Sequence, residues 1–404
     1  MHYLWTIRER RLNMPLRGLR VIDLTDERGI YGAKLLADLG ADVVRPEPPT
    51  GDPLRRRGPL LATDQASQTS LWHAFFASNR RFFSIDLQTA DGQEQLDKLL
   101  AHADIVLSCK DAFAVAEANL TKQLERRPEL VIIDVSSFGK EGPWKDYLAP
   151  DLVAGALGGA AATTGDIDTP PLKGFGELNF MVSGAYVAIA ALAALAKVRK
   201  DGQGQRADIA VHECIASCLE HVLMFYWYPE ELQKPEGKVL PRRGALHWSD
   251  AYAVMPAQNG SVMVTPTPDF DTQLMWLIEE GVEEDLIDTK YQDPENLRLR
   301  IERSMEVLRN WAAGKDAQEL FFQAQERHCP YGLVLPLEAV AENPQLLARD
   351  WYRQLTVDGQ TITAPGAAYH FSNSEGRVDL PLAPHKTATT AAANVLSQLG
   401  WSSP

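Results

Sequence analysis

The sequence is poor in the features that mark several classes of protein. Its 404 residues hold no run of about 18 apolar residues without charge, so no membrane span is expected. The best candidate, residues 180–198, is rich in alanine and predicts a buried helix. Residues 1–13 have no apolar core of signal-peptide length and are interpreted as an extension before Met14. The cysteines are few for a disulfide framework, which predicts a reducing, cytoplasmic location. They are Cys109, Cys214, Cys218 and Cys329.

The sequence also has fewer basic than acidic residues, and it lacks nucleotide-binding glycines after its first expected strand. The formal net charge is −14, which argues against a nucleic-acid partner because binding phosphates needs a basic surface. The turn after the first expected strand reads Thr25-Asp26-Glu27-Arg28-Gly29, where a dinucleotide fold would carry Gly-x-Gly-x-x-Gly. This turn therefore excludes a nicotinamide or flavin site of that kind. The sequence also lacks the Gly-x-Ser-x-Gly and His-Glu-x-x-His motifs of hydrolases and metalloproteases.

Strand and helix patterns alternate through the first part of the chain. Residues 19–24 form an apolar strand pattern, residues 31–39 a helix ended by Gly40, and residues 41–45 the next strand. A strand, a helix and a strand within about 27 residues make a βαβ unit and hence a parallel, doubly wound sheet. Further strands are expected at 83–87, 104–107, 130–135 and 206–211. Helices are expected at 90–101, 112–125, 152–157 and 213–227, together with a long helix that ends at residue 194. The fold class is α/β, with a Rossmann-like large domain and a smaller α+β domain.

The domain boundaries follow from changes in composition. Residues 14–228 are expected to form the large domain, and residues 229–330 a Pro-rich linker followed by the small domain. The small domain begins with a hairpin joined through Asn259-Gly260, and residues 272–326 are helical. Residues 331–404 return to the large domain, with a helix at 337–351 and short strands between 361 and 385.

Charged and sulfur-containing clusters are the candidates for chemistry. Asp26 and Arg28 lie at the carboxyl end of a parallel strand, where such sheets bind ligands, or they pair with each other. The cluster Arg55-Arg56-Arg57 fits phosphate capture or a solvated loop, and Asn79-Arg80-Arg81 has the same two interpretations. Cys214 and Cys218 share one helix face among apolar residues, so they are expected to be core cysteines and no metal site is predicted.

Several stretches, in order along the chain, resemble the family III CoA-transferases of CaiB/BaiF and formyl-CoA transferase type. These are PLRGLRVIDLT at 15–25, LLADLGADVVRPEPPTGDPLR at 35–55, GGAAATTG at 158–165, PPLKG at 170–174, GQGQRADIAVHE at 202–213 and CPYGLVLPLEAVAENPQLLARDW at 329–351. The resemblance implies a Rossmann-like large domain, a smaller domain, a returning C-terminal segment and two subunits interlocked like chain links. It also implies CoA or acyl-CoA as a substrate, with no permanently bound cofactor.

The resemblance implies a nucleophilic aspartate four residues before the glycine of Ser183-Gly184. In this chain that position is Phe180, and phenylalanine has no nucleophilic group. The family's Lys-Arg pair after Asn79 is replaced by phenylalanines, and its CoA-contact motif becomes residues 108–113. A shielding Gly-rich loop is replaced near residues 266–269. The residues expected near CoA are Asp26, Arg28, Arg45, Arg55, Arg56, Asn79, Arg80, Arg81 and Lys110.

Three functional hypotheses remain open from the sequence. The favoured one is a subunit of a heteromeric acyl-CoA:carboxylate CoA-transferase that is catalytically silent itself and supports a paralogous subunit with an intact aspartate. In this view the aromatic residues Trp72, Phe82, Phe83 and Phe180 fill the space of CoA. The second is an active homodimer that uses Glu177 or Asp151 instead; Asp151 is otherwise explained as the N-cap of its own helix. The third is a non-enzymatic binding protein on the same fold. None involves a membrane or a nucleic acid.

Overall fold

The computed structural model describes residues 14–61, 69–109, 116–165, 169–228, 253–265, 270–357, 359–373 and 395–401. The chain divides into two compact units. The first comprises Met1–Gly158, Gly174–Cys218 and Pro344–Pro404, and the second Gly159–Lys173 and Leu219–Asn343. The units therefore divide about ten residues before the expected boundary at 228, and the return to the first unit begins at Pro344 instead of residue 331. The extension at 1–13 lies outside the described residues.

The first unit is built on a six-stranded sheet with the order β5-β2-β1-β6-β7-β8. All neighbouring strands in it are parallel, so the expected doubly wound α/β class is confirmed. Buried β-branched and leucine side chains dominate the central strands, which is typical of a sheet covered on both faces. The strands are β1 (Arg20–Leu24), β2 (Asp42–Glu47), β5 (Arg81–Ser84), β6 (Ile105–Cys109), β7 (Val131–Ser136) and β8 (Arg206–Ala210).

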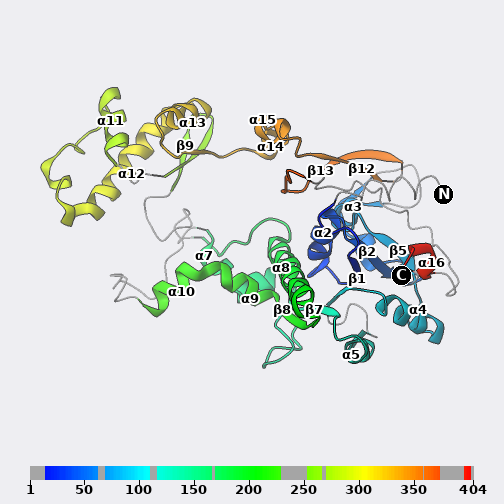
Figure 1. Cartoon of the computed structure of the whole chain (residues 1–404). Helices are drawn as coiled ribbons and strands as arrows, with labels where there is room; N and C mark the ends of the chain where they lie inside the picture. The colour runs from blue at the N-terminus through cyan, green and yellow to red at the C-terminus, as the bar shows by residue number, and fades with distance from the viewer. Residues whose placement is uncertain are drawn as a thin grey trace. The chain divides into compact units, whose positions relative to one another are not determined.

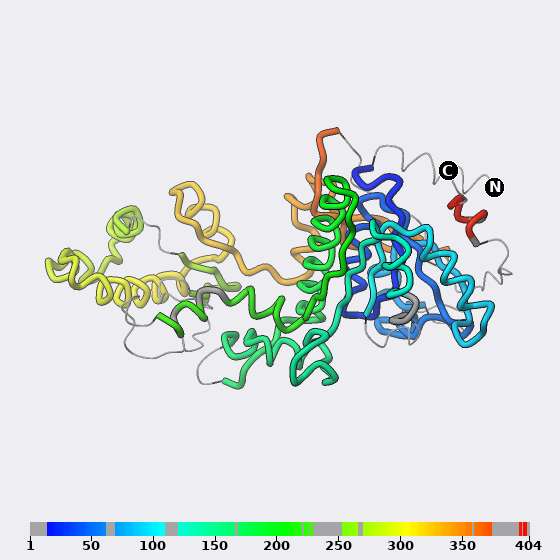
Figure 2. Tube along the Cα trace, turned by 60° about the horizontal axis from the view of Figure 1, so that its bottom comes forward, coloured from blue at the N-terminus to red at the C-terminus, as the bar shows by residue number. Residues whose placement is uncertain are grey.

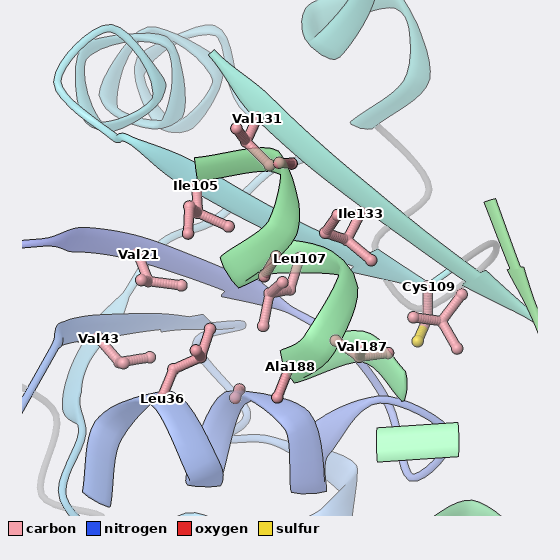
Figure 3. Packing of buried hydrophobic residues seen from close by; sticks show 14 of the residues in the cluster. Val21, Leu36, Val43, Ile105, Leu107, Cys109, Val131, Ile133, Val187 and Ala188 are labelled. Carbon is pink, nitrogen blue, oxygen red and sulfur yellow. The ribbon is translucent and has the colours of Figure 1, made fainter. Parts of the chain in front are cut away.

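Two groups of helices cover the two faces of this sheet (Figure 1). On one face, α2 (Ile30–Asp38) and α8 (Leu178–Asp201) pack on strand residues such as Val21, Ile105 and Ile133 (Figure 3). On the other, α4 (Ala90–Leu100), α5 (Ala116–Arg126) and α16 (Val395–Leu399) surround a second cluster. The C-terminal α16, red in Figure 2, lies against α4, so the last described residues complete the first unit's core.

Helices α2 and α8 pass close to each other at a pair of glycines. A Cβ on Gly184 would lie 2.7 Å from Cβ of Tyr31 and 2.9 Å from N of Gly32. A Cβ on Gly32 would lie 2.6 Å from Val187. The glycine of the Ser183-Gly184 motif therefore has a packing role: it lets α8 approach the helix that follows the first strand.

Helix α8 is long and apolar enough to cross a membrane by length and composition, with a mean hydropathy of 1.9 in its best window. Half of that window is buried, and one face of the helix belongs to the core cluster on the sheet, through Phe180, Val187, Ala188, Ala191, Ala194 and Leu195. This packing fits the core helix predicted from its alanine-rich sequence.

The second unit combines a small antiparallel sheet with helices around its own core. Trp276, Leu308 and Trp311 are buried there against the strands of the order β11-β10-β9. The predicted hairpin is present, but its turn is Gln258-Asn259, one residue before the predicted pair. The elements are α7 (Ala160–Thr163), α10 (Glu220–Trp227), β9 (Ala253–Ala257), β10 (Gly260–Val264), α11 (Phe270–Glu280), η3 (Thr289–Tyr291), η4 (Pro294–Asn296), α12 (Leu297–Ala313), α13 (Ala317–Glu326), β11 (Gly332–Leu333) and α14 (Leu337–Ala341).

Two long helices expected from the sequence are interrupted. The segment 213–227 divides into α9 (Val211–Ala216), a 3-10 turn η2 (Ser217–Leu219) and α10. The segment 337–351 divides into α14 and α15 (Pro344–Ala348), because Pro344 has no N–H to continue the first helix. The remaining elements of the first unit are η1 (Pro53–Arg56), β3 (Leu60–Leu61), β4 (Thr69–Ser70), α3 (Leu71–Phe76), α6 (Asp151–Leu157), β12 (Arg353–Val357) and β13 (Gln360–Ala364).

Candidate active site

The strand order of the large sheet locates its ligand-binding edge. After β1 the chain adds β2 and then β5 on one side of the sheet, and afterwards it adds β6, β7 and β8 on the other side. The neighbours β1 and β6 therefore form the topological switch point, where sheets of this kind bind ligands. At the carboxyl end of β1, the Asp26 carboxylate accepts hydrogen bonds from the backbone N and the Nε of Arg28, both at 3.0 Å. The two residues form the ion pair that the sequence allowed. Ser183 of α8 donates to the Arg28 carbonyl at 2.9 Å, so this turn and the start of α8 are one local structure.

Burial and charge act in opposite directions on the groups of this turn. Burial alone would lower the pKa of Arg28, but its hydrogen bond to Asp26 and the nearby negative charge raise that pKa above its ordinary value. Arg28 therefore carries a fixed positive charge. Burial raises the pKa of the neighbouring Cys109 thiol, which keeps the thiol protonated and unreactive.

The start of α8 is held by Asp151. Its Oδ1 accepts from the backbone N of Phe180 at 3.0 Å, and its Oδ2 accepts from Nδ2 of Asn179 at 2.9 Å. The expectation that Asp151 caps its own helix is wrong: Pro150 is the N-cap of α6, and Asp151 is the first helical residue. Its carboxylate instead satisfies a free N–H at the start of a different helix, 29 residues further along the chain.

Phe180 is 3% exposed and packs within the cluster on the α2 and α8 face of the sheet. The four aromatic residues expected to fill one space lie instead in three separate clusters. Phe83 packs on the opposite face of the sheet, and Trp72 and Phe82 border a small cluster around Ile30. The reason is the alternation of a strand: Phe82 and Phe83 are consecutive in β5 and point to opposite faces.

Glu177, immediately before α8, is held by two residues from the segment after β2. Nη2 of Arg57 forms an ion pair with its Oε1, and Nε1 of Trp72 donates to its Oε2 at 3.1 Å. The Arg57 guanidinium also lies over the Trp72 ring, 4.4 Å from its centroid. Both carboxylate oxygens are therefore occupied by donors. These three residues are called the carboxylate triad below.

A buried ion cluster lies beneath the loop that carries the three arginines. Arg45 pairs with Asp23 at 3.0 Å and with Asp52 at 2.6 Å, and Arg80 pairs with Asp23 at 3.1 Å. All four side chains are at most 4% exposed. Burial would lower the pKa of Arg45, but the two aspartates raise it, whereas burial lowers the pKa of Arg80 to about 10. Arg45 and Arg80, which were predicted near CoA, are thus already engaged inside the protein.

His73 and Glu47 border this buried cluster. Burial, reinforced by the positive charges of Arg55, Arg45 and Arg80, lowers the pKa of His73 to about 2, so the imidazole is neutral. Glu47, Asp52 and His73 present ligand atoms within 4.8 Å of one another, a grouping that can hold a metal ion elsewhere. Here each carboxylate already binds an arginine, Glu47 to Arg55 at 2.8 Å and Asp52 to Arg45. The arginine cations take the place that a metal cation would need.

Three comparisons with known proteins place the chain. The sequence profile described as CoA-transferase family III matches residues 16–388. The chain belongs to CoA-transferase family III. It is 30% identical over 363 residues to the succinyl-CoA:(R)-benzylsuccinate CoA-transferase subunit BbsE of Thauera aromatica, covering 87% of each chain. It is 28% identical over 340 residues to the succinyl-CoA–D-citramalate CoA-transferase of Chloroflexus aurantiacus, covering 83% of this chain and 82% of that one.

A solved structure of a CaiB/BaiF family protein from Brucella suis has the same fold. The TM-score is 0.79 at 23% sequence identity, over 96% of this chain and 100% of that one. The family resemblance seen in the sequence motifs is therefore confirmed over nearly the whole chain, and so is the α/β fold that it implied.

Within this family III chain, the remaining residues predicted near CoA lie in different places. Arg56 is exposed at the end of η1, beside Arg55, which pairs with Glu47. Asn79 and Arg81 lie at the amino-terminal end of β5, away from the carboxyl edge: Asn79 donates to Asp38 at 2.6 Å, and Arg81 pairs with Asp42. Lys110 lies outside the described residues, as do residues 266–269. Of the two loop residues predicted near CoA, Arg55 and Arg56, it is Arg56 whose charge faces solvent.

One of the two expected core cysteines lies at the surface, and one ion pair in the structure was not expected from the sequence. Cys214 is buried but Cys218 is exposed, so only the first is a core cysteine, because the helix breaks at η2 between them and turns the second outward. Sequence analysis also missed the pairing of Arg57 with Glu177, which joins residues 120 positions apart. The available signal was charge: Glu177 is the acid nearest to Phe180 in the sequence, and Arg57 belongs to a run of three arginines.

Proposed function

We propose that this chain is the non-catalytic subunit of an acyl-CoA:carboxylate CoA-transferase and works with a paralogous subunit that supplies the nucleophilic aspartate. The observation that carries the proposal is Phe180, a buried phenylalanine at the position where the family resemblance implies that aspartate. A phenyl ring cannot attack a thioester, so the reaction needs a carboxylate from elsewhere.

The acids near the start of α8 do not offer a replacement. The Asp151 carboxylate accepts hydrogen bonds from Asn179 and Phe180, and the Glu177 carboxylate is held by Arg57 and Trp72. Using Asp151 would break the contacts that hold the start of α8, and the Arg57 cation makes the Glu177 carboxylate a weaker nucleophile. This argument disfavours an active homodimer based on Glu177 or Asp151.

The relatives support a transferase more than a simple binding protein. BbsE is itself named as a subunit of a CoA-transferase, and the other relative is a CoA-transferase as well. We therefore expect an interlocked pair with a related subunit in the cytoplasm. CoA and acyl-CoA are its substrates, and the exposed Arg56 is suited to bind a phosphate of CoA.

The chemistry expected of the pair is an exchange through covalent intermediates. The partner's aspartate attacks the acyl-CoA carbonyl and CoA thiolate leaves, which gives a mixed anhydride. The thiolate attacks the aspartyl carbonyl, releases the donor acid and forms an aspartyl thioester. The acceptor carboxylate attacks that thioester and releases CoA thiolate, which then takes the acceptor acyl group and frees the aspartate.

The proposal is tested by reconstitution. The chain should be purified alone and together with the related subunit from its own source, and CoA transfer between carboxylic acids should be measured. We expect activity only from the pair, and its loss when the partner's aspartate is changed to asparagine. Phe180→Leu in this chain, an apolar control, should leave the activity of the pair intact. Full transferase activity from this chain alone would overturn the proposal.

A further inference from the structure

The last described residues, 395–401, form a compact motif of their own, called the C-terminal clasp below. Helix α16 is followed by Gly400 in the left-handed region, at a φ of 64°. The backbone N of Gly400 donates to the carbonyl of Ser397 at 3.1 Å, and that of Trp401 donates to the carbonyl of Leu396 at 2.8 Å. These two bonds make a Schellman motif, which ends a helix and turns the next residue back toward it. The clasp therefore carries its own turn.

The clasp is held to the first unit by side chains and adds no strand to the large sheet. Leu399 and Trp401 are 6% and 2% exposed and belong to the cluster that α4 forms with the sheet. A helix of five residues is too short to be stable by itself in water, so α16 depends on this burial. The clasp thus binds in the way that a short peptide ligand binds to a groove.

The surface that receives the clasp is the amino-terminal edge of three neighbouring strands. Arg81, Asp42 and Arg20 are the first residues of β5, β2 and β1, which are adjacent and parallel. Their charges alternate along that edge. Nε1 of Trp401 donates to Oδ2 of the central Asp42 at 2.7 Å. The guanidinium carbons of Arg20 and Arg81 lie 5.8 and 5.9 Å from the centroid of the indole ring, within the range of a cation–π contact.

Arg81 also recognises the end of the clasp helix. It pairs with Asp42, and its Nη1 donates to the carbonyl of Leu399 at 3.1 Å. The last carbonyls of a helix lack partners within the helix and favour a cation, so the arginine supplies both a bond and a charge. The side chains of Arg81 and Asp42 are 23% and 21% exposed, so the polar side of this site is reached by solvent.

We propose that the C-terminal clasp is a detachable peptide ligand of the edge formed by Arg20, Asp42 and Arg81. It opens and closes while the sheet stays folded, and a free peptide of the same sequence takes its place. The first unit is assembled from three separate stretches of chain, and the clasp fastens the last stretch to the first. This edge is opposite to the carboxyl ends of the strands, so the device is separate from the candidate active site.

Binding of a fluorescein-labelled peptide of residues 394–404 to the full-length chain tests the proposal, with fluorescence anisotropy as the readout. In the unchanged chain the tethered clasp competes at a high effective concentration. We therefore expect the peptide to bind the Trp401→Ala chain at least about tenfold more tightly than the unchanged chain. A peptide that itself carries Trp401→Ala should bind the Trp401→Ala chain at least about tenfold more weakly than the unchanged peptide does. Thermal unfolding shows that each variant chain is folded.

A double-mutant cycle locates the peptide at Asp42. Asp42→Asn, added to the Trp401→Ala chain, should weaken binding of the unchanged peptide more than that of a Trp401→Phe peptide, because phenylalanine has no N–H to donate. Glu94→Gln, on an exposed residue of α4, is the matched control and should change the affinity less than about twofold. Equal weakening of both peptides by Asp42→Asn would show that the indole does not bind this edge and would overturn the proposal.

Hydrogen exchange in the unchanged full-length chain tests detachment without any substitution in the clasp. We expect the amides of Gly400 and Trp401 to exchange faster than those of Val21 and Val43, because opening of the clasp leaves β1 and β2 folded. The proposal is overturned if these four amides exchange at one common rate, since the clasp would then leave only when the whole unit unfolds. It is also overturned if the folded Trp401→Ala chain binds the peptide no better than the unchanged chain does.

Discussion

The buried ion cluster and the carboxylate triad both place arginines against carboxylates, yet they differ in access to water. Arg45 and Asp23 are at most 1% exposed, while Arg57 and Glu177 are 32% and 19% exposed. In the cluster, each charge is desolvated and needs its partner at all times. In the triad, water already solvates part of the pair, so one partner can leave without a large penalty.

This difference separates a scaffold from a site. Asp52 joins the cluster to the loop after β2, since it pairs with Arg45 and also accepts from the backbone N of Leu54 at 2.8 Å. The cluster thereby fixes the short helix η1, which ends one residue before Arg57. The buried charges hold the loop in place, and the exposed ones at its end remain able to exchange partners.

The largest expected effect comes from breaking the buried cluster. Arg45→Met removes the cation between Asp23 and Asp52 and leaves two buried carboxylates with reduced compensation. We expect a loss of about 3–5 kcal/mol in the free energy of unfolding, measured by denaturant titration. Arg56→Met, on the exposed neighbour, should cost less than about 0.5 kcal/mol. Similar costs for the two variants would contradict the distinction between a buried scaffold and an exposed loop.

A smaller loss is expected where a single buried carboxylate holds a helix start. Asp151→Ala leaves the N–H of Phe180 without its acceptor, and leaves the amide of Asn179 with the backbone carbonyl of residue 151, at 3.1 Å, in place of two acceptors. We expect a loss of about 1–2 kcal/mol in unfolding free energy, in the range of a lost helix cap. Asp146→Ala, at an exposed pair with Lys145, is the control and should be nearly neutral. If Asp151→Ala were equally neutral, the role of Asp151 at α8 would be wrong.

The sequence was sufficient for the parts of the fold that depend on local pattern. The apolar strands, the connecting helices and the parallel sheet follow from periodicity, and the Asp26–Arg28 pair follows from a separation of two residues. Contacts between distant elements could not be predicted in this way. Asp151 and Glu177 could each be placed near α8, but which donors reach them depends on the packing of α3, η1 and α6, which periodicity does not specify.

Replacing His73 should change the free energy of unfolding by an intermediate amount that depends on pH. The pKa of His73 falls to about 2 in the folded protein, against an ordinary value of 6.5. Below pH 6.5 the unfolded chain therefore binds a proton that the folded chain does not, and stability decreases as the pH falls. At pH 5.5 this difference amounts to about 1.4 kcal/mol.

His73→Phe keeps a ring beside Phe82 and removes the titrating group. Its unfolding free energy should therefore fall less between pH 7 and pH 5.5 than that of the unchanged protein, by roughly the amount given above. Parallel pH profiles for His73→Phe and the unchanged protein would show that His73 does not carry this dependence.

The smallest expected effect on stability belongs to the triad. Glu177→Gln keeps an oxygen that can accept from Arg57 or from Trp72 and loses only the charge of a partly exposed pair. The change in unfolding free energy should be below about 1 kcal/mol by denaturant titration, because solvent screens the pair. A loss as large as that of Arg45→Met would mean that Glu177 is part of the scaffold, as the buried ion cluster is, and that partial exposure does not weaken this pair.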